Sequence, residues 1–266
     1  MSVRKKARSV IYTLFFGVVV ILLSVVIALA GLLLVRRLAP LEFLESHSEA
    51  TSTIHHAIAI VFGVAVAFAV FLVWEQLLMA QETTQREAGD VEALYRLATQ
   101  LPEPNRDQLQ QQARSYAETV VKEEWPLLAR GQASTQAQNT ADKLRENIEE
   151  FDPQTMAEQE LYARMLTKAD ELEENRGIRL LQSREGVPTL IWLALVIGGI
   201  ITVAFTYLFG MDRPRLHMLR VAALTIIVAL SLYTIRIIEY PFTGDVRIGA
   251  DAFEVVLDRI EGPSEQ

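Results

Sequence analysis

One uninterrupted stretch decides the fold of this chain: residues 54–98, IHHAIAIVFGVAVAFAVFLVWEQLLMAQETTQREAGDVEALYRLA. Its first part, residues 54–74, is almost wholly apolar, and the remainder is rich in charged residues. No proline, the residue that most strongly breaks a helix, lies between the two parts. The stretch therefore predicts one long helix that crosses a membrane in its first half and stands in the cytosol in its second half.

Four windows of the sequence are nearly free of charged residues, although 22% of the whole chain is charged. A helix needs ~20 apolar residues to cross the hydrocarbon core of a bilayer. A soluble helix would alternate apolar and polar faces, and these windows do not. We expect an all-α integral membrane protein with four transmembrane helices and a cytosolic helical domain inserted between spans two and three. The windows are residues 10–35, 54–74, 187–211 and 221–235.

The windows divide the chain into an N-terminal membrane hairpin, a cytosolic helical domain, a C-terminal membrane hairpin and a cytosolic tail with a short amphipathic helix. Their expected limits are 1–80 (spans about 10–35 and 54–80), 81–187, 188–238 (spans about 188–210 and 217–238) and 239–266.

Basic residues precede the first window, and by the positive-inside rule they keep the N-terminus in the cytoplasm. A cleaved signal peptide is the alternative, since Ala28-Leu29-Ala30 resembles a cleavage site. The apolar run continues to Val35, which is longer than a signal peptide requires, so we favour an uncleaved first span. We expect a multi-pass protein of the cell (inner) membrane with both termini cytoplasmic, and residues 38–53 as an outer loop.

Composition excludes several classes of function. The net charge of −8 lies in the acidic block of residues 81–187, which argues against nucleic acid as a partner. The chain has no cysteine, so it has no disulfide framework or thiolate chemistry. No phosphate loop, nucleophile elbow or metal-binding spacing occurs. We therefore expect no enzyme, no catalytic residues, no cofactor and no bound metal.

The four histidines, His47, His55, His56 and His217, all lie at or beside the expected outer ends of the spans. His55 and His56 are candidates for metal binding or pH sensing, but adjacent helical residues point about 100° apart and chelate poorly. We favour ordinary interfacial histidines.

The second span has two candidate faces. Ala59, Gly63 and Ala67 fall four residues apart, a spacing of small residues that lets another helix approach closely. Phe62, Val66 and Phe71 are bulky enough to form an apolar constriction in a pore. For both sets we favour packing inside a helix bundle over a role in lining a pore.

In the fourth span, the apolar segment between two arginines is too short to cross a bilayer core. Only residues 221–235 separate Arg220 from Arg236, about 22 Å of helix against the ~30 Å of a bilayer core. Ionisable groups inside membranes tend to pair, so Glu75 at the end of span two is a candidate partner for Arg236. Two side chains that reach separately to the lipid headgroups are the alternative.

The polar block contains further helices. Pro102 and Pro104 end the long helix, and Asn105 is expected to cap a helix to about residue 130, bent near Trp125-Pro126. We expect a connector at 131–139, a short helix at 140–150, and a long helix that Asp152 caps and Pro153 begins. Buried positions are Leu109, Ala113, Tyr116, Val120, Leu127, Leu161, Met165, Ala169 and Leu172. In the tail, Phe253, Val256, Leu257 and Ile260 form one apolar face, which lies along the helices or on the membrane.

Several short motifs, taken in order, carry a family resemblance. They are Glu87-Ala88 with Leu94-Tyr95-Arg96; Leu101-Pro102 with Arg106; Glu124-Trp125-Pro126; Arg176 with Arg179-Leu180 and Ser183; Pro188 with Trp192; and Pro241-Phe242-Thr243-Gly244. Together they resemble the bestrophin-like family of bacterial membrane proteins, which is distantly similar to the bestrophin anion channels. The likeness runs from about residue 54 to residue 260.

Bestrophins are pentameric anion channels with four spans per subunit and a large cytosolic helical part, so the resemblance implies a homo-oligomer of four or five subunits. The acidic calcium-binding cluster of animal bestrophins is not present, and no bestrophin residue maps onto span two. We expect an oligomeric ion channel in the lipid bilayer, conducting small inorganic anions through a pore lined by the second span. The alternative is a non-conducting scaffold or sensor that presents its cytosolic helices to a protein partner.

Overall fold

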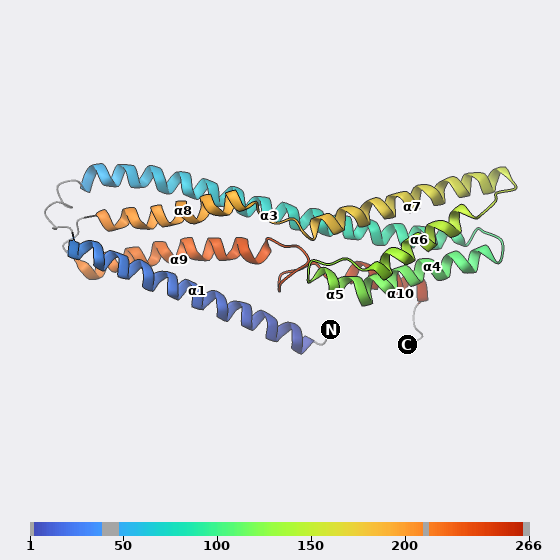
Figure 1. Cartoon of the computed structure of the whole chain (residues 1–266), viewed down its shortest axis with the longest axis horizontal. Helices are drawn as coiled ribbons and strands as arrows, with labels where there is room; N and C mark the ends of the chain where they lie inside the picture. The colour runs from blue at the N-terminus through green and yellow to red at the C-terminus, as the bar shows by residue number, and fades with distance from the viewer. Residues whose placement is uncertain (1–2, 39–47, 210–212, 263–266) are drawn as a thin grey trace. The chain divides into compact units, whose positions relative to one another are not determined.

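The computed structural model describes residues 3–38, 48–209 and 213–262, and within these ranges it contains helices and no strand (Figure 1). The helices are α1 (Val3–Leu38), α3 (Ser48–Ala98), α4 (Asn105–Thr119), a π-helix η1 (Val120–Glu124), α5 (Trp125–Leu128), α6 (Thr135–Glu149), α7 (Met156–Gln182), α8 (Thr189–Phe205), a 3₁₀-helix η2 (Thr206–Leu208), α9 (Pro214–Ile238) and α10 (Asp251–Glu261). The expected all-α class is confirmed.

The chain divides into two compact units. Residues Met1–Trp74 and Gly186–Glu239 form the first, which we call the span unit. Residues Glu75–Glu185 and Tyr240–Gln266 form the second, which we call the helical unit. Helix α3 contributes to both, so the residues after the fourth span belong with the block that separates spans two and three.

Within the residues that the structure describes, four helices are long and apolar enough to cross a membrane: Ile11–Leu38, Ser52–Ala98, Thr189–Leu208 and Pro214–Ile238. The protein is therefore a multi-pass membrane protein. Helix α9 has 25 residues, about 37 Å, because it begins before Arg220 and encloses both arginines. Helix α3 starts at Ser48 rather than at Ile54, so only residues 39–47 of the expected outer loop, including His47, lie outside the described residues.

Small residues let the helices of the span unit pack closely. A Cβ at Gly17 of α1 would overlap the Tyr233 ring of α9, and the Tyr233 hydroxyl donates to the Thr13 carbonyl at 2.6 Å. A Cβ at Gly199 would lie 2.9 Å from Val228, and one at Gly198 would lie 3.0 Å from Phe62. Helix α8 thus packs closely against its neighbours at Gly198-Gly199.

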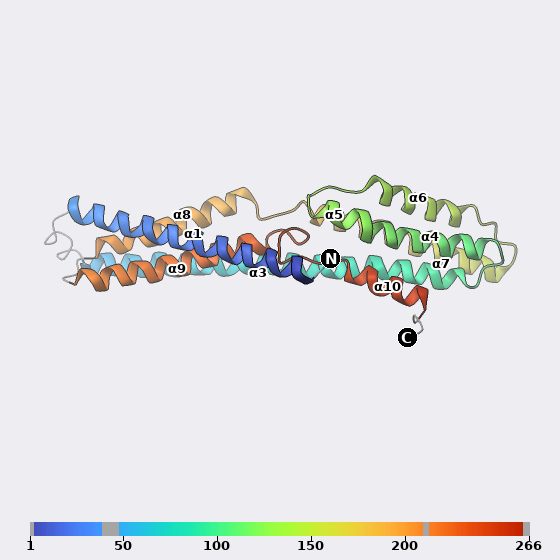
Figure 2. The ribbon, with the colours of Figure 1, turned by 90° about the horizontal axis from the view of Figure 1, so that it is seen from below.

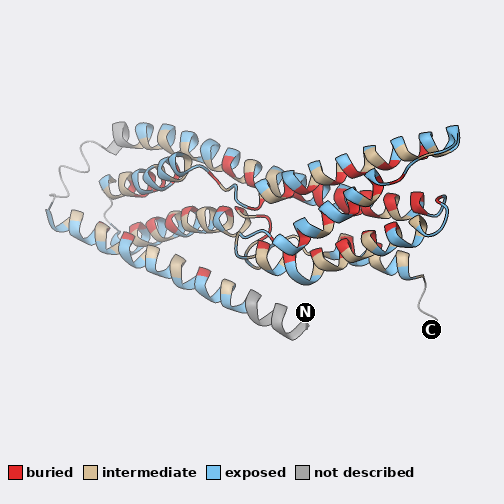
Figure 3. Cartoon of the chain, turned by 45° about the vertical axis from the view of Figure 1, so that its right-hand side comes forward, coloured by how far each residue is buried: buried red, intermediate tan, exposed pale blue. Residues whose placement is uncertain are grey.

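Many of the large apolar residues of the span helices are exposed (pale blue in Figure 3). Phe16 and Leu23 on α1 and Phe68 on α3, for example, are more than half exposed. A soluble protein could not tolerate so large an apolar surface. These faces are suited to lipid or to neighbouring subunits.

The helical unit has an apolar core of its own, formed by the second half of α3 with α4, α6, α7 and α10 (Figures 1 and 2). Leu109, Ala113, Tyr116 and Val120 are buried there as expected, and so are Leu161, Met165, Ala169 and Leu172. Leu127 is only partly buried, and the fully buried neighbour is Leu128.

Several helix starts differ from expectation, each because of local hydrogen bonds. Helix α6 begins at Thr135, inside the expected connector, because the Ser134 hydroxyl accepts from the Ala137 N–H at 3.2 Å. Helix α7 begins at Met156 rather than at Pro153. Thr155 and Glu158 form a reciprocal capping box there, with bonds of 3.2 and 3.0 Å, and this satisfies two N–H groups that a cap at Asp152 would leave unpaired.

Asn105 does not cap α4. The Arg106 N–H donates to the Pro102 carbonyl and the Gln108 N–H donates to the Pro104 carbonyl, each at 3.2 Å, so helical bonding starts before Asn105. The tail helix α10 lies in the core of the helical unit, with Phe253 fully buried and Val256 nearly so. Its apolar face is therefore not available to a membrane.

Candidate functional site

A cluster of buried charges lies inside the helical unit. Glu87 on α3, Glu124 at the end of η1 and Arg179 on α7 have no side-chain surface exposed to solvent. Arg179 binds Glu87 through two bonds, from Nε to Oε2 at 2.5 Å and from Nη2 to Oε1 at 2.9 Å. Its Nη2 also donates to Oε2 of Glu124 at 2.8 Å. One guanidinium thus joins three helices.

A second arginine completes the cluster. Arg176 lies one turn before Arg179 on α7, and its Nη2 donates to Oε1 of Glu124 at 2.8 Å. It also donates to the Gln138 side chain of α6. Glu124 therefore lies between two guanidinium groups. With two carboxylates and two guanidiniums the cluster is neutral, which is the condition under which ions are tolerated in a protein interior.

Tyr116 of α4 adds the remaining polar contact. Its hydroxyl donates to Oε1 of Glu87 at 2.6 Å. Burial, followed by the charge of Glu87, raises the pKa of Tyr116 well above its ordinary value. Burial alone would lower the pKa of Arg179, but Glu87 and Glu124 outweigh it and raise that pKa above its ordinary value. The phenol and the guanidinium therefore keep their protons at neutral pH.

An aromatic layer covers the cluster. The Trp125 ring lies 5.1 Å from the Arg179 guanidinium carbon, in cation–π geometry. Phe242 and Phe253, from the chain after α9, each lie 5.8 Å from the Trp125 ring. The indole N–H also donates to the Ile248 carbonyl at 3.2 Å. The C-terminal segment is thereby fixed onto the charge cluster.

A π-helix positions Glu124 and Trp125. The expected bend near Trp125-Pro126 takes the form of η1, which inserts one residue into the helical repeat immediately before α5. Pro126 has no N–H to donate to the preceding turn, which favours such an irregularity. π-Helical turns occur frequently at functional sites. Here the turn directs Glu124 into the core while Pro126 remains exposed.

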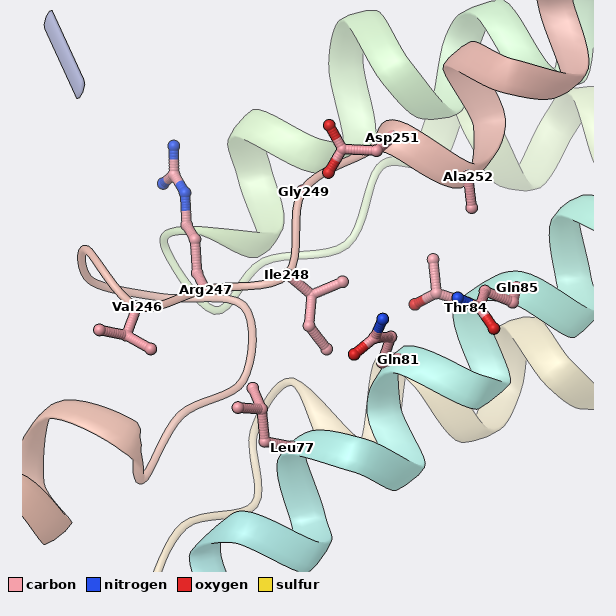
Figure 4. Close-up of a pocket in the computed structure, with 10 residues that line it drawn as sticks. All are labelled: Leu77, Gln81, Thr84, Gln85, Val246, Arg247, Ile248, Gly249, Asp251 and Ala252. Atoms are coloured by element: carbon pink, nitrogen blue, oxygen red, sulfur yellow. The ribbon is translucent and has the colours of Figure 1, made fainter.

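A pocket of about 270 Å³ lies beside this layer, between α3 and the segment that precedes α10 (Figure 4). Leu77 and Gln81 of α3 face Ile248 and Asp251 across it, and Arg247 points away (Figure 4). Among the residues that the structure describes, no group of three or more His, Asp or Glu side chains is placed to hold a metal.

The structure brings together six of the residues singled out by the family resemblance: Glu87, Glu124, Trp125, Arg176, Arg179 and Phe242. The other motif residues lie outside the cluster. Tyr95 packs against the apolar core, and Arg96 is exposed and pairs with Glu92. Pro241 accepts from the Ile248 N–H at 2.8 Å, and Gly244 adopts a positive φ of 77° in the turn that follows.

Two side chains make buried hydrogen bonds that the sequence pattern did not predict. Tyr116 was expected only as one member of an apolar stripe, although a phenol on such a stripe is a signal for a buried acceptor. Glu239, in the span unit, accepts from the Val187 N–H at 3.1 Å and from Trp192 Nε1 at 3.0 Å. It thereby ties the start of α8 to the end of α9.

The candidate residues of span two divide into two groups. Phe62 and Val66 pack against the apolar clusters inside the span unit, and Ala59 is partly buried. Gly63, Ala67 and Phe71 are exposed. Arg236 donates to Glu239 at 3.3 Å. Its pairing with Glu75, which belongs to the other unit, stays a prediction.

Comparisons with known proteins agree with this architecture. A family model described as a Bestrophin-like domain matches residues 9–253. Two structures of a bacterial bestrophin homologue from Klebsiella pneumoniae share the fold. A single-site mutant has a TM-score of 0.69 at 12% identity, with 92% of this chain and 99% of that chain covered. A second structure, phased on zinc, has a TM-score of 0.67 at 13% identity, with coverage of 91% and 96%. No curated protein matches the chain.

Proposed function

The chain belongs to the Bestrophin-like family, and on that premise we propose that it is one subunit of an oligomeric ion channel. We propose that the channel lies in the cell (inner) membrane with both termini and the helical unit in the cytosol. An even number of candidate spans and the basic N-terminal residues support this orientation.

The observation that carries the proposal is the two-sided character of span two. Phe62, Val66, Ala69 and Val73 face the interior of the span unit. On the opposite side of the helix, Ile60, Val64, Ala67 and Phe71 recur at the same spacing and are exposed, the three large ones by 67, 52 and 61%. We propose that this second face lines the pore. Rings of apolar side chains are sufficient for a constriction that gates by dewetting.

The charge of the side chains near a pore determines whether it selects anions or cations. The family resemblance implies anions, but Glu75 lies one turn after Phe71 and on the same side of α3, where a ring of carboxylates would favour cations. The effect of Glu75→Gln on ion selectivity depends on whether this side chain faces the pore. If Glu75 faces the pore, the substitution increases the permeability of chloride relative to sodium; if Glu75 is paired with Arg236, it does not.

The absence of cysteine in the native chain allows a direct test. Single cysteines at Ile60, Val64, Ala67 and Phe71 are treated with a charged, water-soluble thiol reagent while ion flux from liposomes is recorded. We expect the reagent to reduce flux at these positions. Cysteine at Leu23, which is exposed on α1, and at Ala69, which is buried, serve as controls that the reagent leaves unaffected.

The mass of the purified protein is measured alongside. A closed ring of four or five subunits with flux supports the channel. A monomer or dimer without flux removes any central pore and favours the scaffold, whereas a conducting ring insensitive at all four positions moves the pore to another face.

A further inference from the structure

A buried histidine joins three helices of the span unit. His217, in the first turn of α9, is only 1% exposed. Its Nε2 lies 2.8 Å from the Thr206 carbonyl oxygen of η2, and its Nδ1 lies 3.1 Å from Nη2 of Arg36 on α1. Thr206 follows α8 directly, so one imidazole connects the ends of α1 and α8 to the start of α9.

The two partners determine the protonation state of the ring. A carbonyl oxygen only accepts, so Nε2 carries the hydrogen. A guanidinium only donates, so Nδ1 is unprotonated and accepts from Arg36. Both contacts are satisfied by neutral imidazole in a single tautomer. A second proton on Nδ1 would point at the guanidinium and place two positive charges about 3 Å apart.

The described charged groups that act on His217 oppose a second proton. Among the described residues, the charged groups that act on His217 are Arg36 on α1 and Arg220 on α9 itself, both cationic. The titratable side chain of η2 is Tyr207, whose ring lies against Gly31 of α1. On α3, the titratable ring of His55 contacts Phe209, the residue that follows η2, edge-on with 5.3 Å between the ring centroids.

We propose that His217 is a proton-sensitive latch, which fastens α1 and η2 to α9 when neutral and releases them when it takes up a proton. In water an imidazole is half protonated near pH 6.5, and the released form, whose ring is hydrated, accepts that proton. Acid therefore favours release of α1 from α9. The latch stands on the geometry of the span unit, and only its effect on flux rests on the proposed channel.

Thermal unfolding of the full-length protein in detergent tests the latch. Between pH 7.5 and pH 5.5 we expect the Tm of the wild type to fall by about 3–6 °C more than that of His217→Gln, whose amide offers an acceptor and a donor but does not titrate. Arg36→Gln, which removes the opposing charge, should show a smaller acid-induced fall than the wild type. His56→Gln is the matched control, because His56 is exposed and bonded only within its own helix, and it should behave as the wild type. Equal acid sensitivity of the wild type and His217→Gln, or loss of it in His56→Gln, would overturn the proposal.

A second measurement keeps His217 in place. Spin labels on cysteines introduced at Leu34 of α1 and Leu219 of α9, both exposed, report the separation of the two helices. Release predicts that this distance lengthens or broadens from pH 7.5 to pH 5.5, and an unchanged distance contradicts it. A change in distance without a change in ion flux leaves the latch in place and shows that the latch does not control conduction, whereas protein without any ion flux counts against the channel alone.

Discussion

Replacing Glu87 by glutamine tests whether the charge cluster holds the helical unit together. The substitution preserves the shape of the side chain but removes the negative charge that faces Arg179 and that accepts from Tyr116. One carboxylate then remains against two guanidinium groups in a site without solvent. Removing one partner of a buried ion pair costs about 3–5 kcal/mol, so we expect the Tm of the full-length protein to fall by about 10 °C.

The matched control lies on the same helix. Glu82 pairs with Arg86 at 2.5 Å, but both side chains are more than 60% exposed, and such pairs contribute about 0–1 kcal/mol. Glu82→Gln should therefore change the Tm by no more than about 2 °C. The comparison separates the effect of burial from that of the chemical substitution itself.

A double variant separates charge imbalance from lost packing. Glu87→Gln combined with Arg179→Met leaves Glu124 and Arg176, which again form a neutral pair. We expect the double variant to be more stable than the sum of the single effects predicts, because neither buried charge lacks a partner. Circular dichroism gives the unfolding curves. Additive effects, or a Glu87→Gln variant as stable as Glu82→Gln, would refute this account of the cluster.

Three further predictions follow from contacts of single side chains. Tyr116→Phe should lower the free energy of unfolding by about 1.5–3 kcal/mol, the value of a hydrogen bond to a charged group, and Tyr162→Phe, on a partly buried ring, should cost less. Because the folded state raises the pKa of Tyr116, the unfolded chain loses this proton first, so wild-type stability should fall above about pH 10 more steeply than that of Tyr116→Phe. Glu239→Ala should lower the free energy of unfolding by about 2–5 kcal/mol because two N–H donors lose their acceptor. Glu239→Gln retains a carbonyl oxygen and should lower it much less, and denaturant unfolding of both variants measures the difference. Phe253→Ala should lower the free energy of unfolding by about 3–5 kcal/mol, because Phe253 is fully buried. Val255 is about half exposed, so Val255→Ala should lower it by less than about 0.5 kcal/mol. Equal values for the two variants would contradict the packing of α10 in the core of the helical unit.

The spans were predictable because each is a long, continuous run of apolar residues. The length and apolar composition of such a run are sufficient to predict that it lies in lipid, and no contact with a distant part of the chain has to be known. The continuity of α3 could be read in the same way, since neither Pro nor a turn cluster interrupts it before Ala98. The apolar stripe at Leu161, Met165 and Ala169 likewise follows from helical spacing alone.

The helix starts were harder because single hydrogen bonds decide them. Asp152-Pro153 has the composition of a helix start, but Thr155 with Glu158 satisfies two donors and therefore begins the helix instead. Ser134 similarly turned part of an expected connector into α6. Choices of this kind differ by about 1 kcal/mol, which sequence pattern alone does not resolve.

The charge cluster was accessible only in part. Glu87, Glu124 and Arg179 were singled out by resemblance, but they are separated by many residues along the chain and nothing local pairs them. The acidic composition of residues 81–187 is typical of helices whose charged side chains face solvent. Only the packing of α3, η1 and α7 shows that these charges neutralise each other without water.

The charge cluster lies in the helical unit and not on span two, and this limits what family membership says about ion conduction. Six of the motif residues that carry the resemblance meet in the helical unit, around Arg179 and Trp125, where they join helices and fix the C-terminal segment. The outward face of span two, from Ile60 to Phe71, contains none of them. A chain could therefore keep every motif, and with it the fold, while the side chains of that face change the conducted ion or close the pore. For this reason the resemblance supports the architecture more strongly than the ion, and chemical modification of span two is the measurement that bears on conduction directly.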